Sequence, residues 1–461
     1  MQLRKFFAAK NDWLIFGGLL IIFAALKIAF LAPHFADGWV YFYFGKLLSL
    51  HQLPYKDFFY SSPPLIPYFM WFWYSFFGFN LSLANFLPVL FSLVDAFLIF
   101  LLIRKKSRNI ALLITFAYLF SFLNFATTDY FSEAHPLTTL VLLALSFMEN
   151  KKFFLAGLFF GLAGLTKLYG ILPAVFLIPF IFDKQKRSLS KFLMGIIASF
   201  VFINWVFYLN LGRHYLDLTF FNHLHKTAGI AKSSIFKFFI SRDFLLLLVL
   251  PFSILRGNFR KIARVSVVLG TLVVFFAVFK DIYYLYLKVF LAVFVVFLGF
   301  LIKQKTIVFP KKKTFTVALV LILTNSVLAI TSYITNQTDK ARIENLSAIV
   351  AEAQKFDRPI FGDFEITPLV ALLSGRNIFH NYVDTNSKWT DLGVFSPEKV
   401  AAEVHAASGV TVLTKNFVDQ NIHGLEKLLP EKYFSENCQL QKSFPITNDY
   451  EDNAILVWSC S

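Results

Sequence analysis

Long apolar runs recur through the first three quarters of the chain, and they constrain its fold more than any other feature. Hydrophobic residues make up 57% of the 461 residues, whereas soluble domains usually contain about 45–50%. A helix of about 20 apolar residues is long enough to cross the hydrocarbon core of a bilayer. We therefore expect a mostly α-helical bundle that passes several times through the plasma membrane.

Eleven runs are predicted to span the membrane. They are 14–32, 82–103, 109–125, 136–148, 153–168, 171–182, 190–210, 244–256, 265–279, 284–302 and 314–334. With eleven spans, the clusters of Lys and Arg between the runs fall on the side of the N-terminus, as is typical of cytoplasmic loops. We therefore expect the N-terminus inside and the C-terminus outside. Counting Leu65–Phe79 as a twelfth span would break this pattern, so we predict an interfacial or re-entrant helix there.

The formal net charge of +16 would indicate nucleic-acid binding in a soluble protein. Here the basic residues lie in short clusters between apolar runs, so we expect membrane lipid and no nucleic acid as a partner. Lys27, near the outer end of the first run, is expected to reach the lipid headgroups. The sequence has no Gly-rich phosphate loop, His-Glu-x-x-His helix or Cys-x-x-Cys pair. It leaves open whether Cys438 and Cys460 form a disulfide.

From about Asp339 the composition changes, because the apolar runs stop and charged residues become frequent. Alternating helical and strand-like segments are predicted at 341–356, 359–361, 367–373, 396–407, 410–413 and 454–458. Such alternation favours a small α/β domain. We therefore predict a transmembrane domain over 1–338, whose first outer loop carries interfacial helices, and a small extracytoplasmic α/β domain over 339–461.

The predicted topology gathers acidic and basic residues in the outer loops. These are Asp37, Asp57, Asp129, Glu133, Lys167, His223, His225 and Lys226. Acids beside cations at a membrane surface suit a site that activates a hydroxyl and binds a phosphate.

Simpler explanations stay open for several of these residues. The two acids of the second outer loop could be only solvated, and Lys167 could extend to the headgroups. Asp57 could stabilise a turn or pair with Lys56. His223 and His225 have a spacing that suits a metal, but no third ligand is evident. Asp95, inside an apolar run, is expected to bond a neighbouring helix.

The first outer loop opens with Asp37 and continues through Gly-Lys-Leu-Leu-Ser-Leu-His-Gln-Leu-Pro-Tyr-Lys-Asp to a Pro-Pro pair. Further on come an acid in the second outer loop, the motif Gly-Leu-Ala-Gly-Leu-Thr-Lys-Leu-Tyr-Gly, and the tail segment Gly-Asp-Phe-Glu-Ile-Thr-Pro. This order resembles the C-type integral-membrane glycosyltransferases, which use polyprenyl-phosphate sugars. The pattern is most similar to protein O-mannosyltransferases and lipid A aminoarabinose transferases.

The resemblance implies transfer of a hexose or pentose from a polyprenyl-phosphate donor to an acceptor hydroxyl of a protein, lipid or glycan. Asp37 matches the family's catalytic first-loop aspartate and would be the general base of an inverting displacement. Many mannosyltransferases have Asp-Glu there, whereas this chain has Asp37-Gly38. A second acid or acceptor-binding role would therefore pass to Asp57, Asp129 or Glu133.

The leaving phosphate needs cations, and Lys167, His223, His225 and Lys226 are the candidates. The resemblance implies no particular cofactor and leaves a divalent metal open, since some members of the superfamily use one and others do not. The alternative is a transporter or a flippase of lipid-linked glycans. Such proteins place ionisable groups at the bilayer midplane, whereas the acids here lie mostly at one surface.

Overall fold

The computed structural model describes residues 2–182, 186–226, 231–252, 262–302, 311–335, 343, 345–407, 409–416, 425–445 and 454–460. The chain forms two compact units. Unit 1 comprises Met1–Leu31, Asn85–Val206 and Ala228–Gln337, and unit 2 comprises Ala32–Ala84, Phe207–Thr227 and Thr338–Ser461. Each unit is therefore built from three separate stretches of sequence.

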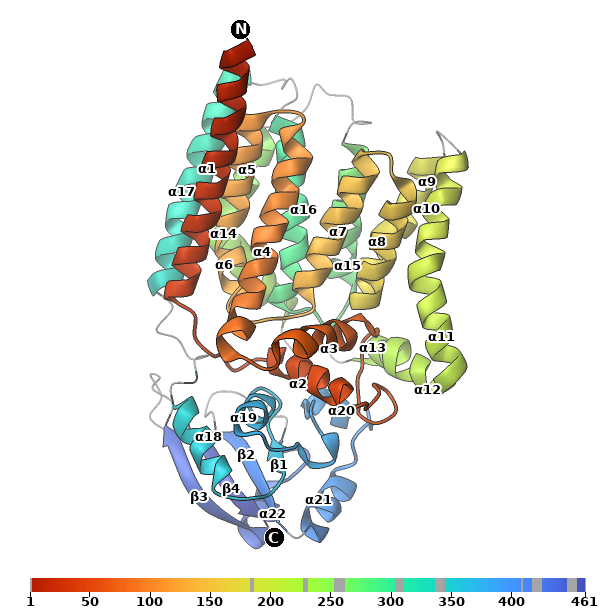
Figure 1. Ribbon diagram of the computed structural model, residues 1–461, viewed down its shortest axis with the longest axis vertical. Helices are drawn as coiled ribbons and strands as arrows, with labels where there is room; N and C mark the ends of the chain where they lie inside the picture. Colours follow the sequence, from red (N-terminus) through yellow and green to blue (C-terminus); the bar gives the residue numbers. More distant parts are fainter. Residues whose placement is uncertain are drawn as a thin grey trace. The chain divides into compact units, whose positions relative to one another are not determined.

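Unit 1 is a bundle of helices that run side by side (Figure 1). Its helices are α1 (Gln2–Ala29), α4 (Leu81–Arg104), α5 (Arg108–Leu119), α6 (Phe122–Thr127), α7 (Ala134–Glu149), α8 (Phe153–Thr166), α9 (Leu172–Phe182), α10 (Lys186–Ile196), α14 (Lys232–Phe252), α15 (Ala263–Val278), α16 (Leu287–Ile302) and α17 (Lys311–Thr335). A π-helical turn, η2 (Ile197–Val201), joins α10 to α11 (Phe202–Leu211). The first residues of α4 and the last of α11 belong to unit 2.

Each of the eleven predicted runs coincides with one helix or with consecutive helices, although 253–256 of one run lie outside the described residues. Five described helices are long and apolar enough to cross a membrane: Asp12–Ala29, Leu81–Arg104, Lys186–Leu211, Tyr284–Ile302 and Phe315–Thr335. Five more apolar helices are shorter. The mostly helical membrane protein is therefore confirmed. The count of eleven spans and their orientation stay predictions, and parts of the basic clusters at 184–191, 256–264 and 303–313 lie outside the described residues.

Helices α8 and α10 approach closely because glycines face each other. A Cβ atom on Gly157 would lie 2.0 Å from the carbonyl oxygen of Phe192, and one on Gly195 would lie 2.2 Å from that of Phe154. Small residues at a helix contact allow two backbones to come together, which is how helices gain packing energy in a lipid environment. The two helices are therefore held by backbone contact rather than by large side chains.

The run 109–125, predicted as one helix, is divided into α5 and α6. Buried Asp243 lies at a non-helical point of α14, with φ −120°. Its carboxylate accepts hydrogen bonds from the backbone N–H groups of Phe122 (3.0 Å) and Leu123 (2.9 Å). It thus caps the first turn of α6 from another helix. Asn325 of α17 also donates to this carboxylate, at 2.9 Å. The division arises from a long-range contact that hydropathy does not reveal.

Unit 2 contains helices and a four-stranded sheet. Its helices are α2 (Gly38–Ser49), α3 (Leu65–Phe77), α12 (Arg213–Leu216), α13 (Asn222–His225), α18 (Leu346–Gln354), α19 (Thr367–Ser374), α20 (Ser387–Asp391), α21 (Pro397–Ala406) and α22 (Glu431–Asn437). The strands are β1 (Ile360–Gly362), β2 (Val410–Asn416), β3 (Cys438–Pro445) and β4 (Ala454–Cys460). They are ordered β1-β2-β4-β3, with β1 and β2 parallel and the other pairs antiparallel.

The expected small C-terminal sheet is present. The segments predicted as strands at 359–361, 410–413 and 454–458 correspond to β1, β2 and β4. Strand β3 was not predicted, because it is a mostly polar edge strand and a register shift between Leu440 and Lys442 interrupts its alternation. A disulfide between Cys438 and Cys460 joins β3 to β4 and answers the question that the sequence left open.

Helix α3 lies in unit 2 and packs against α2. Trp71, Phe72, Phe76 and Phe77 are exposed on it. An exposed face of large apolar and aromatic residues is what a helix at a membrane surface presents to lipid. The interfacial placement of this helix stays a prediction, and this exposed face supports it.

Candidate active site

The loop between α6 and α7 carries Asp129 and Glu133, and His135 holds it in place. The backbone N–H of Ser132 donates to Nδ1 of His135 at 3.1 Å, so this nitrogen is the acceptor. Nε2 therefore carries the hydrogen and donates to the carbonyl oxygen of Thr127 at 2.8 Å. Both ring nitrogens of buried His135 are occupied in joining the two ends of the loop.

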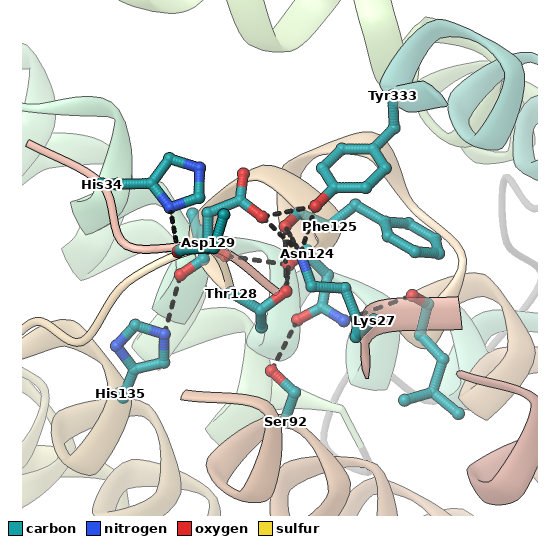
Figure 2. A network of polar contacts seen from close by, with 12 residues as sticks. Lys27, His34, Ser92, Asn124, Phe125, Thr128, Asp129, His135 and Tyr333 are labelled. Carbon is teal, nitrogen blue, oxygen red and sulfur yellow. Dashed lines mark hydrogen bonds and ion pairs between the residues drawn. The ribbon is translucent and has the colours of Figure 1, made fainter. Parts of the chain in front are cut away.

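Asp129 pairs with Lys27 at the end of unit 1 where α1 and α17 terminate, which we call the polar end. Lys27 Nζ lies 2.5 Å from Asp129 Oδ1 and 2.5 Å from the hydroxyl of Tyr333, and donates to the carbonyl oxygen of Phe125 at 3.0 Å (Figure 2). The Tyr333 hydroxyl also donates to Asp129. The expectation that Lys27 reaches the headgroups is wrong, because its side chain is only 1% exposed and fully used by these partners.

Glu133 forms an ion pair with Lys167, which directly follows α8 in an extended backbone conformation. Lys167 Nζ also lies 4.9 Å from the ring centre of Tyr286. Next to it, the ring of Tyr169 is stacked on Phe275 at 4.7 Å. The Tyr169 hydroxyl is buried and has no hydrogen-bond partner among the described residues. A buried hydroxyl without a partner is uncommon, so it points to a ligand or water at this position.

Asp37 stands at the start of α2 in unit 2. It is half-buried, and its side chain does not cap the helix. Its carbonyl oxygen accepts a hydrogen bond from the backbone N–H of Val40 at 3.1 Å. Two residues after Asp37, Trp39 Nε1 donates to the carbonyl oxygen of His34 at 2.7 Å, which ties the segment before Asp37 to the first turn of α2. The Asp37 carboxylate therefore follows a well-packed turn and does not cap the N-terminus of α2.

Asp57 makes a local hydrogen bond, as expected of an aspartate that stabilises a turn. The residue is exposed, and its Oδ2 accepts the backbone N–H of Leu53 at 2.7 Å, which closes the turn before it. This contact explains why an aspartate follows Leu-Pro-Tyr-Lys without assigning it a role in chemistry. Its catalytic or acceptor-binding role stays a prediction.

The histidine segment belongs to unit 2 and contacts other parts of that unit. His223 Nε2 contacts the carbonyl oxygen of Ser61, and Lys226 Nζ lies 4.2 Å from the ring centre of Trp389. His225 is exposed, with its Nδ1 2.9 Å from the carbonyl oxygen of Phe221. Among the described residues, no three His, Cys, Asp or Glu side chains are grouped so as to hold a metal ion.

The sequence-predicted residues thus form two sets. Asp129, Glu133 and Lys167 gather at the polar end of unit 1, whereas Asp37, Asp57 and the segment 223–226 lie in unit 2. The convergence of Lys167 with His223–Lys226 stays a prediction, since the two belong to different units.

A buried polar network inside unit 1 was only partly predicted. Asp95 accepts hydrogen bonds from Tyr118 (2.9 Å) and Thr139 (2.5 Å), which confirms that it bonds neighbouring helices. Lys288, which sequence reasoning missed, donates to Ser92 (2.7 Å) and Asn124 (2.9 Å). The sequence could have indicated Lys288, because a lone lysine within an apolar run needs buried polar partners.

Two comparisons with known proteins bear on this arrangement. The sequence model of the family described as dolichyl-phosphate-mannose-protein mannosyltransferase matches residues 61–208. Among solved structures, ArnT from Cupriavidus metallidurans bound to undecaprenyl phosphate matches with a TM-score of 0.67 and 10% identity, over 97% of this chain and 98% of that one. The predicted resemblance to the C-type membrane glycosyltransferases is confirmed. The apo form of the same ArnT matches with a TM-score of 0.68 and 12% identity, over 98% of each chain.

No curated protein sequence matches this chain. The segment that matches the mannosyltransferase family contains Asp129, Glu133 and Lys167, but it begins after Asp37 and ends before His223. The likeness to ArnT extends over nearly the whole chain and concerns the fold. The C-type glycosyltransferase resemblance is thus supported by sequence over residues 61–208 and by fold over nearly the whole chain.

Proposed function

We propose that the protein transfers a sugar from a polyprenyl-phosphate donor to an acceptor hydroxyl at the outer membrane surface. The observation that carries this proposal is the carboxylate–cation cluster at the polar end. Three of its members, Asp129, Glu133 and Lys167, lie within the segment that matches the mannosyltransferase family. The ArnT structure with undecaprenyl phosphate supports a polyprenyl donor, because that protein shares the fold. The sugar can be a hexose or a pentose, and the acceptor a protein, lipid or glycan.

In this proposal Lys167 binds the donor phosphate. Its charge is now balanced by Glu133, and the unsatisfied hydroxyl of Tyr169 lies close by. A phosphate oxygen accepts charge-assisted hydrogen bonds well, so it would satisfy both donors. His223 and Lys226 are further cations for the same phosphate, and His225 is the exposed member of that segment.

Asp37 acts as the general base. The acceptor oxygen forms a bond to the anomeric carbon while the bond from that carbon to the phosphate oxygen breaks. The acceptor proton passes to the Asp37 carboxylate, and the electron pair leaves with the polyprenyl phosphate. A single displacement of this kind inverts the anomeric configuration. The leaving phosphate needs positive charge rather than a proton, which is the role assigned to Lys167.

The test uses purified protein in lipid nanodiscs, with polyprenyl-phosphate hexose and polyprenyl-phosphate pentose supplied separately with a membrane extract from cells that lack the protein. We expect one labelled sugar to pass to an acceptor in the extract, with stoichiometric release of polyprenyl phosphate. Comparing the glycans of cells with and without the protein then identifies the acceptor. A parallel experiment uses the same protein in lipid vesicles. Movement of intact donor from one leaflet of the vesicle membrane to the other, without release of polyprenyl phosphate, would instead support the flippase alternative. Asp95 and Lys288 give that alternative no support, because both bond neighbouring helices.

A further inference from the structure

Lys415, near the end of β2, lies in a buried ionic cluster in unit 2. Its side chain is 5% exposed and forms ion pairs with Asp363 at 3.7 Å and with Glu365. Asp363 directly follows β1, and Glu365 comes two residues later. This turn is itself well held, because the backbone N–H of Glu365 donates to Asp363 Oδ1 at 2.9 Å and that of Asp363 donates to the carbonyl oxygen of Leu413 at 2.9 Å. One cation thus joins the ends of two parallel strands.

The same cluster contacts the residues immediately before Asp37. Lys415 Nζ lies 5.6 Å from the ring centre of Phe35, and the carbonyl oxygen of Glu365 accepts the backbone N–H of Ala36 at 3.4 Å. A few residues earlier, the carbonyl oxygen of Pro33 accepts the backbone N–H of Ile343 at 3.0 Å. The tail therefore holds the backbone that leads into Asp37 at two points.

Stability alone does not account for this cluster. A buried lysine is costly to desolvate, and buried ion pairs are often no more stable than apolar residues of the same size. Burial by itself would lower the pKa of Lys415, but the charges of Asp363 and Glu365 raise it above its ordinary value. The lysine is therefore charged at physiological pH, and its fixed charge holds the Asp363–Glu365 turn against Phe35 and Ala36.

We propose that Lys415 is a positioning residue that acts through the Phe35–Ala36 segment to place the carboxylate of Asp37 for proton transfer. The inference rests on the proposed function of Asp37. It gives the C-terminal sheet a part in the transfer step itself. A displacement of about 1 Å in a catalytic group can reduce the rate by about 10²-fold, so a loosened segment lowers kcat even when the donor still binds.

The experiment compares Lys415→Met with two variants of the purified protein. Lys427→Met removes a surface lysine of the same domain, which pairs with Asp391 at 2.6 Å. Lys415→Arg keeps the charge. We measure kcat and donor Kd, with kcat expressed per donor-binding molecule. For Lys415→Met we expect kcat to fall about 10- to 100-fold with donor Kd unchanged. Lys427→Met should match wild type, and Lys415→Arg should recover most of the rate.

Two further variants separate positioning from folding. Because Lys415→Met leaves two carboxylates buried without a counter-charge, Lys415→Met/Asp363→Asn/Glu365→Gln provides a neutral cluster, and the same loss of kcat is expected in it. In the Asp37→Asn background, Lys415→Met should cause no further loss of the residual transfer, since its effect passes through Asp37.

Normal kcat in Lys415→Met or in the neutral triple variant would overturn the inference, as would a further loss in the Asp37→Asn background. An absence of transfer by the wild-type protein with every donor would instead overturn the proposed function. Normal transfer by Asp37→Asn would overturn the role of Asp37 in that proposal. The three failures are therefore distinguishable.

Discussion

Single charged side chains in this protein depend on partners that are distant in sequence. Lys27 and Tyr333 are separated by 306 residues, yet both contact Asp129. Likewise, Lys167 at the end of α8 pairs with Glu133 in the loop before α7. Asp37 stands at the start of α2, and its side chain does not cap that helix. In the proposed function, Asp37 is the proton acceptor and Lys167 the phosphate ligand.

The change Asp37→Asn keeps the size of the side chain and most of its hydrogen bonding but removes proton acceptance. We expect transfer to fall about 10²–10⁴-fold, while donor binding persists. The measurement is the rate of sugar transfer from purified polyprenyl-phosphate donor together with the donor Kd. Asp57→Asn is the matched control in the same loop and should have a milder effect. Near-normal transfer by Asp37→Asn would rule out Asp37 as the base.

The change Lys167→Ala should weaken use of the donor about ten-fold or more, because a charge-assisted hydrogen bond contributes about 1.5–3 kcal/mol. Lys167→Ala also leaves Glu133 buried without its cation, so Lys167→Ala/Glu133→Gln is measured beside it. Lys152→Ala, at an exposed lysine just before α8, serves as the control. Donor titrations report the effect. A donor affinity equal to wild type in the double variant would assign Lys167 a structural role only.

Helices in unit 1 are joined by buried polar groups as well as by apolar packing. Asp243 of α14 caps α6, and Lys288 of α16 bonds residues of α4 and α6. These contacts position the short α6, from which the loop carrying Asp129 and Glu133 continues. The candidate site is therefore supported by elements that contribute no catalytic residue of their own.

Lys288 bonds Ser92 and Asn124 and interacts electrostatically with buried Asp95. The change Lys288→Met should therefore destabilise the bundle by about 3–5 kcal/mol, because it removes the cation that balances this buried carboxylate. The double variant Lys288→Met/Asp95→Asn removes that charge and should recover a large part of the loss. Thermal unfolding in detergent, read from the same preparation for both variants, reports the difference. Equal stability of the single and double variants would show that the two residues are not coupled.

At the scale of the whole molecule, the predicted first outer loop and the C-terminal sheet belong to the same compact unit. The sequence predicted a tail domain that begins near Asp339, but unit 2 also includes Ala32–Ala84 and Phe207–Thr227. The residues around Asp37 are thus built into the same unit as the tail. Truncation of the tail therefore removes part of the support of Asp37, in line with the role proposed for Lys415.

The predicted orientation is tested by labelling engineered cysteines in intact cells. Ser347→Cys should react with a membrane-impermeant reagent, whereas Lys312→Cys should be protected until the membrane is opened, because basic clusters mark the cytoplasmic side. The disulfide between Cys438 and Cys460 leaves both native cysteines without a free thiol, so the unmodified protein is the background control. Labelling of position 312 with protection of position 347 would reverse the predicted topology.

The sequence by itself determined where the helices lie. The hydrocarbon core of a bilayer offers no water to backbone polar groups, so a single apolar run of about 20 residues satisfies them internally by forming a helix. The same local information located β1, β2 and β4, whose residues are mostly buried. It also identified Asp129, Glu133 and Lys167 as polar residues on one face, since loops between spans alternate between the two sides.

Only the tertiary structure decided which of these groups meet. The ion pairs of Asp129 with Lys27 and of Glu133 with Lys167, the cap of Asp243 on α6, and the contact of Glu365 with Ala36 all join residues far apart in the chain. Hydropathy and periodicity describe each segment separately and hold no information on such pairs. A hydrogen bond forms only between atoms that packing has brought within about 3 Å, and packing is a property of the whole folded chain.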